Sequence, residues 1–206
     1  METIRWIFFD IGSTLVDETD AYDHRAREML LGTNISFEAF DAQRIAFAKQ
    51  GLNGDSEAIK HFHLDKTPWP SHLEDLFSDA EAVLKTLFEN GFHLGIIANQ
   101  NPGTAGRLES WGLKHYFSVI AASAELGTAK PNPEIFLTAM DMAGCTPEEA
   151  VMVGDRLDND ILPAKKLGMK TVWMRTGLAR YQKNTGADYV VDTLSELLDL
   201  FLHNSN

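Results

Sequence analysis

Short runs of apolar residues recur along the chain, and several of them end at a polar residue. The first run, Trp6-Ile7-Phe8-Phe9, is too short for a helix and rich in β-forming residues, so it predicts a buried strand that ends at Asp10. Similar runs predict strands at 92–98, 116–122, 150–154, 170–174 and 188–191. The stretches between them have helical periodicity, and one of them predicts an amphipathic helix at 133–143 that Gly144 ends. Strands that alternate with helices predict a mainly parallel sheet with right-handed crossovers and helices on both faces.

The segment 17–78 has a different pattern, because its apolar residues follow helical spacing and no stretch predicts a strand. Helices are predicted at 21–31 and at 55–64. A further helix between them is predicted to begin after Ser36, which would cap it. Ser78 is predicted to cap the next helix, where the alternation of strands and helices begins. We therefore expect a small all-helical insertion that packs over the ends of the strands.

Composition and charge exclude several classes of protein. The chain has 206 residues, of which 44% are hydrophobic, so it can form a proper core and is not expected to be disordered. Its net charge of −12 argues against the basic face that nucleic-acid binding requires. The single cysteine, Cys145, excludes an internal disulfide and a cysteine metal cluster, and it fits a reducing cytoplasm. We expect neither a signal peptide nor a membrane span, since no apolar run is long enough.

Three predicted strands end at positions that a parallel sheet would bring together, because the carboxyl ends of its strands share one edge. The residues expected at this edge are Asp10, Ala98, Asn99, Lys130, Asp155, Asp158 and Asp160. Taken alone, three of these features have a simpler interpretation: Asp10 as the cap of a turn, Lys130 as a surface lysine, and the acidic run after Asp155 as a solvated helix start. Their convergence favours a common site.

The donor set of this site predicts the kind of cation that it would hold. Oxygen ligands without a cluster of Cys or His suit a hard cation such as Mg²⁺. Asp10 and Asp155 would hold it directly, and Asp160 or Asp158 through water. Since the net charge is −12, an anionic substrate also needs local positive charge, from this cation or from a few basic side chains.

Four motifs, in this order, resemble those of the haloacid dehalogenase (HAD) superfamily. They are Phe8-Phe9-Asp10-Ile11-Gly12-Ser13-Thr14-Leu15, Ile96-Ile97-Ala98-Asn99, Ala129-Lys130-Pro131-Asn132-Pro133-Glu134-Ile135-Phe136, and Val153-Gly154-Asp155 through Asp160. The resemblance covers nearly the whole chain. It implies a Rossmann-like α/β core domain (1–16 and 79–206) and a helical cap domain (17–78) inserted after the first strand. It also implies a phosphatase-type hydrolase with a small phosphorylated substrate.

The chemistry that the resemblance implies is nucleophilic catalysis by a carboxylate. Asp10 would attack phosphorus and form an aspartyl-phosphate, while Lys130 would orient Asp10 and neutralise charge on the transferring group. Mg²⁺ would bind Asp10, Asp155 and the backbone carbonyl of Gly12. The full set of expected metal-site residues is Asp10, Gly12, Asp155 and Asp160. The residues expected at the phosphoryl group are Ser13, Ala98, Asn99, Gln100 and Lys130.

Two positions depart from the pattern of this family. Its phosphatases usually carry an aspartate two residues after the nucleophile, which protonates the leaving oxygen and later activates water, but this chain has Gly12 there. General acid–base help is worth ~10²–10⁴-fold in rate, so substrates with poor leaving groups should suffer most. Ala98 replaces the Ser or Thr that normally hydrogen-bonds the phosphoryl group. The backbone N–H of Asn99, or the side chain of Asn99 or Gln100, would have to substitute.

Three functions follow, in order of preference. The first is a Mg²⁺-dependent phosphohydrolase, slow or restricted to activated substrates, in which a cap residue or water replaces the missing acid. The second is a non-catalytic binding or regulatory protein that kept the phosphate and metal pocket. The third is a 2-haloacid dehalogenase, which would need no metal and would leave Asp155 and Asp160 unexplained. The sequence predicts neither the physiological substrate nor whether the protein is a monomer or a dimer.

Overall fold

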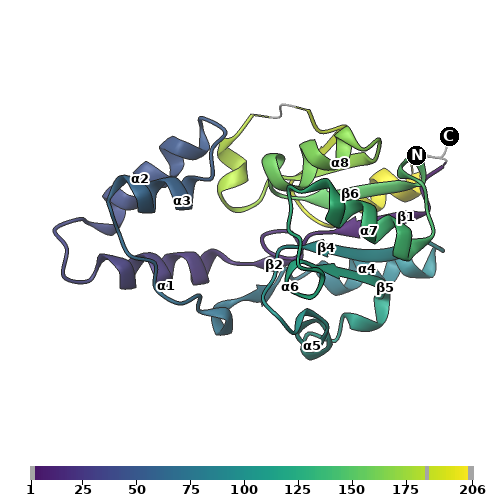
Figure 1. Ribbon diagram of the computed structural model, residues 1–206, viewed down its shortest axis with the longest axis horizontal. Coiled ribbons are helices and arrows are strands. Elements are labelled where there is room, and N and C mark those ends of the chain that lie inside the picture. Colours follow the sequence, from purple (N-terminus) through teal and green to yellow (C-terminus); the bar gives the residue numbers. More distant parts are fainter. Residues whose placement is uncertain (1–2, 184–185, 204–206) are drawn as a thin grey trace.

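The computed structural model describes residues 3–183 and 186–203 and is built around a six-stranded sheet (Figure 1). The strands are β1 (Trp6–Phe9), β4 (His93–Ala98), β5 (Phe117–Ala122), β6 (Ala150–Gly154), β7 (Lys170–Met174) and β8 (Tyr189–Val191). They lie in the order β5-β4-β1-β6-β7-β8, and every neighbouring pair is parallel. The predicted α/β fold with a mainly parallel sheet is confirmed.

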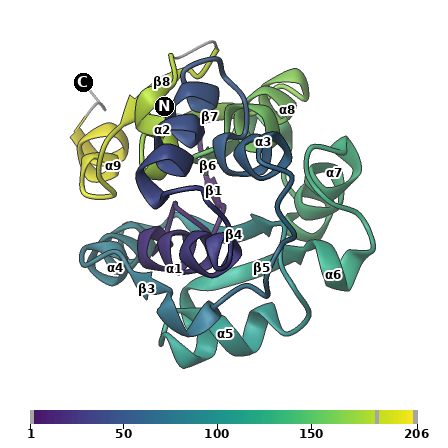
Figure 2. The same cartoon turned by 90° about the vertical axis from the view of Figure 1, so that its left-hand side faces the viewer.

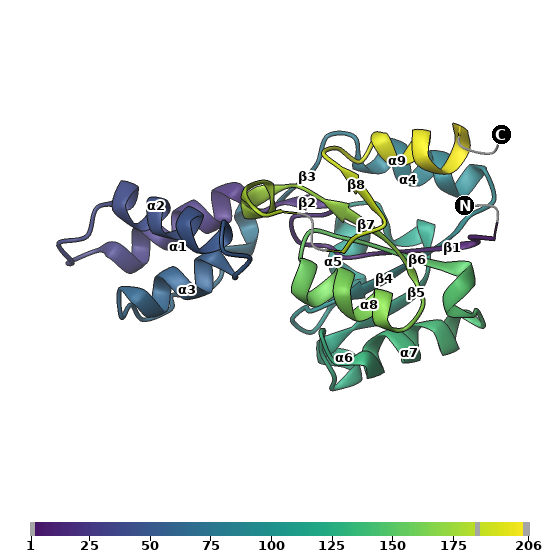
Figure 3. The same cartoon turned by 90° about the horizontal axis from the view of Figure 1, so that it is seen from above.

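Helices cover both faces of this sheet, with α4 and α9 on one side and α7 and α8 on the other (Figure 3). The helices around the sheet are α4 (Ala80–Glu89), α5 (Thr104–Ser110), α6 (Ser123–Leu126), α7 (Pro133–Ala143), α8 (Leu162–Lys166) and α9 (Glu196–Leu198). Successive side chains of β1 point to opposite faces of the sheet, as they do in any β-strand. Ile7 and Phe9 pack in the cluster that contains α4 residues, whereas Trp6 and Phe8 pack in the cluster that contains α7 residues.

Three further helices form a separate group at one end of the molecule, which we call the helical lobe (Figure 1) and which faces the viewer in Figure 2. They are α1 (Thr19–Leu30), α2 (Phe37–Ala48) and α3 (Gly54–His61). As predicted, the side chain of Ser36 caps α2 by accepting a hydrogen bond from the backbone of Ala39. The lobe has its own apolar cluster, in which Phe40 is fully buried. The division into core and cap domains at residues 17 and 78 stays a prediction.

The segments that enter and leave the lobe pair with each other as two short antiparallel strands, β2 (Val16–Asp17) and β3 (Asp75–Leu76). The prediction that 17–78 contains no strand is therefore wrong, because two-residue strands are too short to show an alternating pattern. The prediction that Ser78 caps the next helix is also wrong. Helix α4 begins after Asp79, whose carboxylate accepts hydrogen bonds from the backbone and hydroxyl of Ser195.

The longer elements agree more closely with the sequence, since β6, β7 and α7 have the predicted bounds. The segment after Gly154 begins with a π-helical turn (Leu157–Ile161) before α8, and such turns often occur at functional sites. Short 3₁₀ turns lie at Ser71–Leu73, Lys114–Tyr116, Pro147–Glu149 and Gly177–Tyr181, and a π-helical turn at Asp199–His203 follows α9. Within the described ranges, no helix combines the length and apolar character that a membrane crossing requires.

Candidate active site

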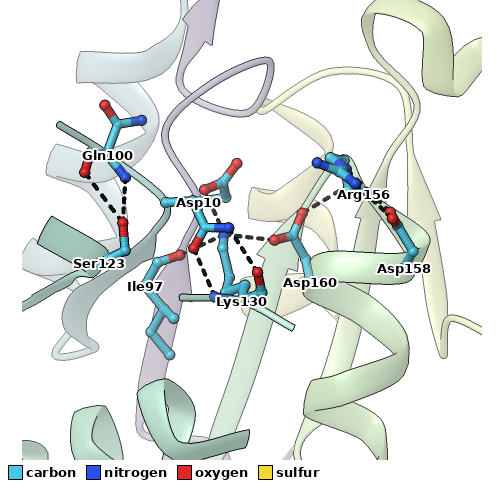
Figure 4. A network of polar contacts seen from close by, with 9 residues as sticks. Asp10, Ile97, Gln100, Ser123, Lys130, Arg156, Asp158 and Asp160 are labelled. Atoms are coloured by element: carbon cyan, nitrogen blue, oxygen red, sulfur yellow. Dashed lines mark hydrogen bonds and ion pairs between the residues drawn. The ribbon is translucent and has the colours of Figure 1, made fainter. Parts of the chain in front are cut away.

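Lys130 lies in the middle of a polar network at the carboxyl ends of β1, β4 and β6 (Figure 4). Its Nζ donates hydrogen bonds to Oδ1 of Asp10 and Oδ1 of Asp160, both at 2.6 Å, and to the carbonyl of Ile97 at 2.8 Å. These three acceptors match the three donors of an ammonium group. Although burial opposes its charge, the carboxylates of Asp10 and Asp160 outweigh burial and raise the pKa of Lys130. Lys130 is therefore a buried cation between two acids.

The loop that carries Lys130 is held by the side chain of Asn99. Its Oδ1 accepts a hydrogen bond from the backbone N–H of Lys130 at 2.7 Å, and its Nδ2 donates to the carbonyl of Lys130 at 2.8 Å. This side chain thus positions the lysine, although the sequence placed it among the phosphoryl-binding groups. Ala98, the last residue of β4, is fully buried and brings no polar side-chain atom to the site.

Gln100, another expected phosphate-binding residue, is also engaged within the protein. Its Oε1 accepts a hydrogen bond from Arg107 at 2.5 Å, and its backbone N–H donates to the hydroxyl of Ser123 at 3.0 Å (Figure 4). Ser123 is a member of the site that the sequence did not indicate, because a serine after a strand is common. The roles of Asn99 and Gln100 in substrate binding stay predictions.

Three carboxylates form the acidic part of the site. One oxygen each of Asp10, Asp155 and Asp160 lie within 4.8 Å of one another, and such an all-oxygen set suits Mg²⁺. The second oxygen of Asp160 accepts a hydrogen bond from the backbone N–H of Arg156 at 2.9 Å. Gly154 makes this packing possible, because a Cβ there would lie 2.5 Å from the carboxyl carbon of Asp160.

The environment of these acids favours a bound cation. Burial, followed by the charges of Asp160 and Asp10, holds the pKa of Asp155 well above its usual range. Burial also raises the pKa of Asp160, against the opposing effect of Lys130. Repulsion of this kind is relieved when a divalent cation binds. Asp158 lies outside the cluster, since it is exposed and pairs with Arg156 at 2.6 Å.

The turn after β1 contains Gly12 and Ser13 and contacts Glu18, the residue just before α1. The hydroxyl of Ser13 donates a hydrogen bond to Oε2 of Glu18 at 3.0 Å, so it is directed at this acid. Burial, and to a lesser extent the charge of Asp10, raise the pKa of Glu18 to about 7. Glu18 itself carried no distinguishing signal in the sequence, because acids are common at helix starts.

Two cavities adjoin this group of residues. One, of about 270 Å³, lies between the helical lobe and loops of the core and is lined by Ser13, Asp155 and Arg44, among others. The other, of about 400 Å³, is lined by Glu18, Glu74, Asn99, Gln100, Arg107 and Ser123, among others. The predicted nucleophile turn and the predicted phosphate-binding residues therefore border space that a small molecule could enter.

A protein-family model described as haloacid dehalogenase-like hydrolase matches residues 7–174. The chain belongs to this family. A glyceraldehyde 3-phosphate phosphatase from Methanocaldococcus jannaschii is 35% identical over 233 residues, which cover 96% of each protein. A protein of the same name from Methanopyrus kandleri is 39% identical over 136 residues, which span 60% of this chain and 55% of that relative. The crystal structure of a HAD phosphatase from Thermococcus onnurineus has a TM-score of 0.67 at 28% identity and covers 96% of this chain and 97% of its own.

These similarities confirm two predictions made from the motifs. The resemblance to the HAD superfamily is confirmed, and so is the class of enzyme, a hydrolase of the phosphatase type. They do not assign roles to individual side chains, so the catalytic and metal-binding roles of Asp10, Gly12, Lys130, Asp155 and Asp160 stay predictions.

Proposed function

We propose that this HAD-family protein is a Mg²⁺-dependent phosphohydrolase that acts on a small phosphorylated metabolite through an aspartyl-phosphate on Asp10. The observation that carries the proposal is the position of Lys130, bonded at 2.6 Å to both Asp10 and Asp160. The lysine fixes one oxygen of Asp10 and leaves the other to attack phosphorus. Its charge also offsets negative charge on the transferring phosphoryl group.

The acidic cluster supports a cation in this reaction. Asp10 and Asp155, together with the carbonyl of Gly12, would hold Mg²⁺, and Asp160 would complete the site while it anchors Lys130. When bound, the cation offsets the repulsion between the attacking carboxylate and the phosphate group. The backbone amides of the turn from Ile11 to Ser13, and that of Asn99, would add donors for the phosphate oxygens.

The helical lobe would serve as the cap that covers the site. It joins the core through the short β2–β3 pair, and the cavity of about 270 Å³ is lined by residues of both the lobe and the core. The side-chain amide of Gln182 also donates to the carbonyl of Leu52 at 3.2 Å, from the core to the lobe. Closure of such a lobe would exclude water and leave space for a small substrate.

The substrate class rests on the named activities of relatives. Because the relatives from M. jannaschii and M. kandleri are named glyceraldehyde 3-phosphate phosphatases, this compound is the first to test. The cytoplasmic location and the monomeric or dimeric state expected from the sequence stay predictions.

A second candidate is a binding or regulatory protein that keeps the phosphate and metal pocket without turnover. It is favoured by the fully buried Ala98, where the family has a hydroxyl, and by the use of the Asn99 side chain to hold Lys130. Both features reduce the number of side chains that are free to contact a phosphoryl group.

Phosphate release decides between these candidates. We would measure it for glyceraldehyde 3-phosphate and for aryl, acyl and sugar phosphates, with Mg²⁺ or with a chelator. Release should require Mg²⁺, and Asp10→Asn should lower it by more than ~1,000-fold because the nucleophile is lost. The matched control is Asp20→Asn, since Asp20 is an exposed acid in the first turn of α1. Background release by the parent across the panel would contradict the phosphohydrolase.

A further inference from the structure

The carboxylate of Glu18 occupies the space that a side chain at position 12 would fill. A Cβ added to Gly12 would lie 2.6 Å from Oε1 and 2.7 Å from Oε2 of Glu18, and 2.8 Å from its carboxyl carbon. Real Cβ atoms do not come so close to other atoms, so a side chain at position 12 and the carboxylate of Glu18 cannot both occupy this space unless one of them moves. A carboxylate is thus present beside the nucleophile turn, although the residue that carries it lies at the start of α1.

The position of Glu18 is defined by its contacts. The hydroxyl of Ser13 donates to Oε2 at 3.0 Å, and the carbonyl of Glu18 accepts the backbone N–H of Tyr22 in the first turn of α1. The residue lines the cavity of about 400 Å³, together with Asn99 and Gln100. Its carboxylate therefore lies between the turn that follows Asp10 and a space that a substrate could occupy.

The other acids near this turn are bonded to basic side chains or belong to the acidic cluster. Asp10 and Asp160 bond to Lys130, and Asp155 belongs to the cluster that suits a cation. Glu74, which lines the same cavity as Glu18, accepts the indole N–H of Trp69 at 2.6 Å and also pairs with Arg107. Among the acids described around the cavity, Glu18 is the one whose side-chain partner is a neutral hydroxyl.

We propose that Glu18 is the general acid and base of the reaction, and that it replaces from α1 the side chain that Gly12 lacks. The inference rests on the proposed phosphohydrolase function. In the first step Asp10 bonds to phosphorus, the bond from phosphorus to the leaving oxygen breaks, and the Glu18 carboxyl gives its proton to that oxygen. In the second step water bonds to phosphorus as Glu18 takes the water's proton. The bond from phosphorus to Asp10 breaks, which releases phosphate and restores both residues.

The first test is the dependence of rate on the leaving group. Glu18→Gln keeps the size and hydrogen-bonding capacity of the side chain but cannot donate or accept the proton. It should lower kcat/KM by ~10²–10⁴-fold for alkyl phosphates such as glyceraldehyde 3-phosphate. For p-nitrophenyl phosphate, whose leaving group needs no proton, first-turnover release of nitrophenol should stay within about tenfold of the parent. The phosphorylated protein should then accumulate, because its hydrolysis still requires a base.

A matched control makes the same chemical change within α1, the helix that Glu18 precedes. Glu28 is an exposed glutamate of α1 that pairs with His24 at 3.4 Å, so Glu28→Gln should leave both substrates unaffected. Equal losses of first-turnover rate on good and poor leaving groups in Glu18→Gln would overturn the acid–base role and indicate a structural one. Unchanged rates on both would also overturn it.

The second test moves the carboxylate to the other position. In a Glu18→Ala background, the side chain of Gly12→Asp has space. The double variant should turn over alkyl phosphates at least tenfold faster than Glu18→Ala alone. In the parent, the same Gly12→Asp change meets Glu18 and should lower the rate instead. Equal rates for Glu18→Ala with and without Gly12→Asp would overturn the proposal, provided that both variants keep the parent's melting temperature within a few degrees.

The two proposals can fail separately. Absence of Asp10-dependent release in the parent contradicts the phosphohydrolase itself. If phosphate release depends on Asp10 but is unchanged in Glu18→Gln, only the proposed role of Glu18 is contradicted.

Discussion

Lys130 combines a structural role with the catalytic role that we propose for it. It is 2% exposed, and its partners Asp10 and Asp160 are 13% and 1% exposed. Removal of one partner from a buried ion pair leaves an uncompensated charge, which typically costs about 3–5 kcal/mol of folding free energy. The fold therefore depends on the same contact that orients the proposed nucleophile.

We predict that Lys130→Met lowers the free energy of unfolding by about 3–5 kcal/mol at pH 7 in the presence of a chelator, because two buried carboxylates lose their cation. Urea denaturation followed by circular dichroism measures this change. The control is Lys60→Met, which removes an exposed lysine 2.7 Å from Glu57 and should cost no more than about 1 kcal/mol. Similar small changes in both variants would contradict the structural role of Lys130.

At the residue scale, the sequence could predict the acids that follow strands but not how side chains approach one another. Asp10 and Asp155 stand directly after apolar runs, so parallel topology alone brings them together. Glu18 reaches the same place only because the turn folds back, and the one hint in the sequence is the missing side chain at Gly12. The Asn99 amide was predicted at the phosphoryl group, and its hydrogen bonds to the backbone of Lys130 depend on loop geometry that no pattern encodes.

Strands β1 and β4 pair through a close contact at the element scale. Phe8 of β1 is in register with Gly95 of β4, and a Cβ at Gly95 would lie 2.6 Å from two carbons of the Phe8 ring. Phe8 is fully buried in the apolar cluster that includes residues of α7, so its ring has little freedom to move. The glycine thus allows a large aromatic ring in the centre of the sheet.

We predict that Gly95→Ala destabilises the protein by about 1–3 kcal/mol, because the added methyl group overpacks this contact. Gly106→Ala is the matched control, since Gly106 lies in α5 and a Cβ there would have no neighbour within 4 Å. That change should stabilise the protein by about 0.5–1 kcal/mol through helix propensity. Urea unfolding of both variants measures the difference, and a neutral or stabilising effect of Gly95→Ala would refute the packing argument.

Elements with a long apolar pattern were predictable, and short ones were not. Helix α7 has a proline in its first turn and a left-handed Gly144 after its end, and these local signals fixed both of its bounds. Strands β2 and β3 have two residues each and arise because the two ends of the lobe segment meet. Helix α4 starts after Asp79 rather than after Ser78, and Asp79 bonds to Ser195, 116 residues away. Contacts over such distances lie outside any local pattern.

On the scale of the whole molecule, the helical lobe and the sheet have separate apolar clusters. Two large clusters lie on the two faces of the sheet, whereas the lobe cluster contains residues from α1, α2 and α3, such as Met29, Phe40 and Ile59. Hydrophobic stabilisation comes from the contacts within each cluster, so disruption of the lobe cluster should leave the two sheet clusters intact. We therefore expect that the lobe can loosen while the site residues of the core stay in place, as the proposed cap would require.

We predict that Phe40→Ala loosens the lobe alone. Truncation of a fully buried phenylalanine typically lowers the free energy of unfolding by about 3–5 kcal/mol. Phe40 packs in the small lobe cluster, so the contacts that are lost are those of the lobe. Hydrogen exchange followed by mass spectrometry should show lost protection in α1, α2 and α3 and parent-like protection in β1, β4 and β6. Phe136→Ala is the matched control, because Phe136 is equally buried but packs against the sheet, where protection should fall instead. A uniform loss of protection in Phe40→Ala would mean that lobe and sheet unfold as one unit, and substrate access would then need a route other than independent motion of the lobe.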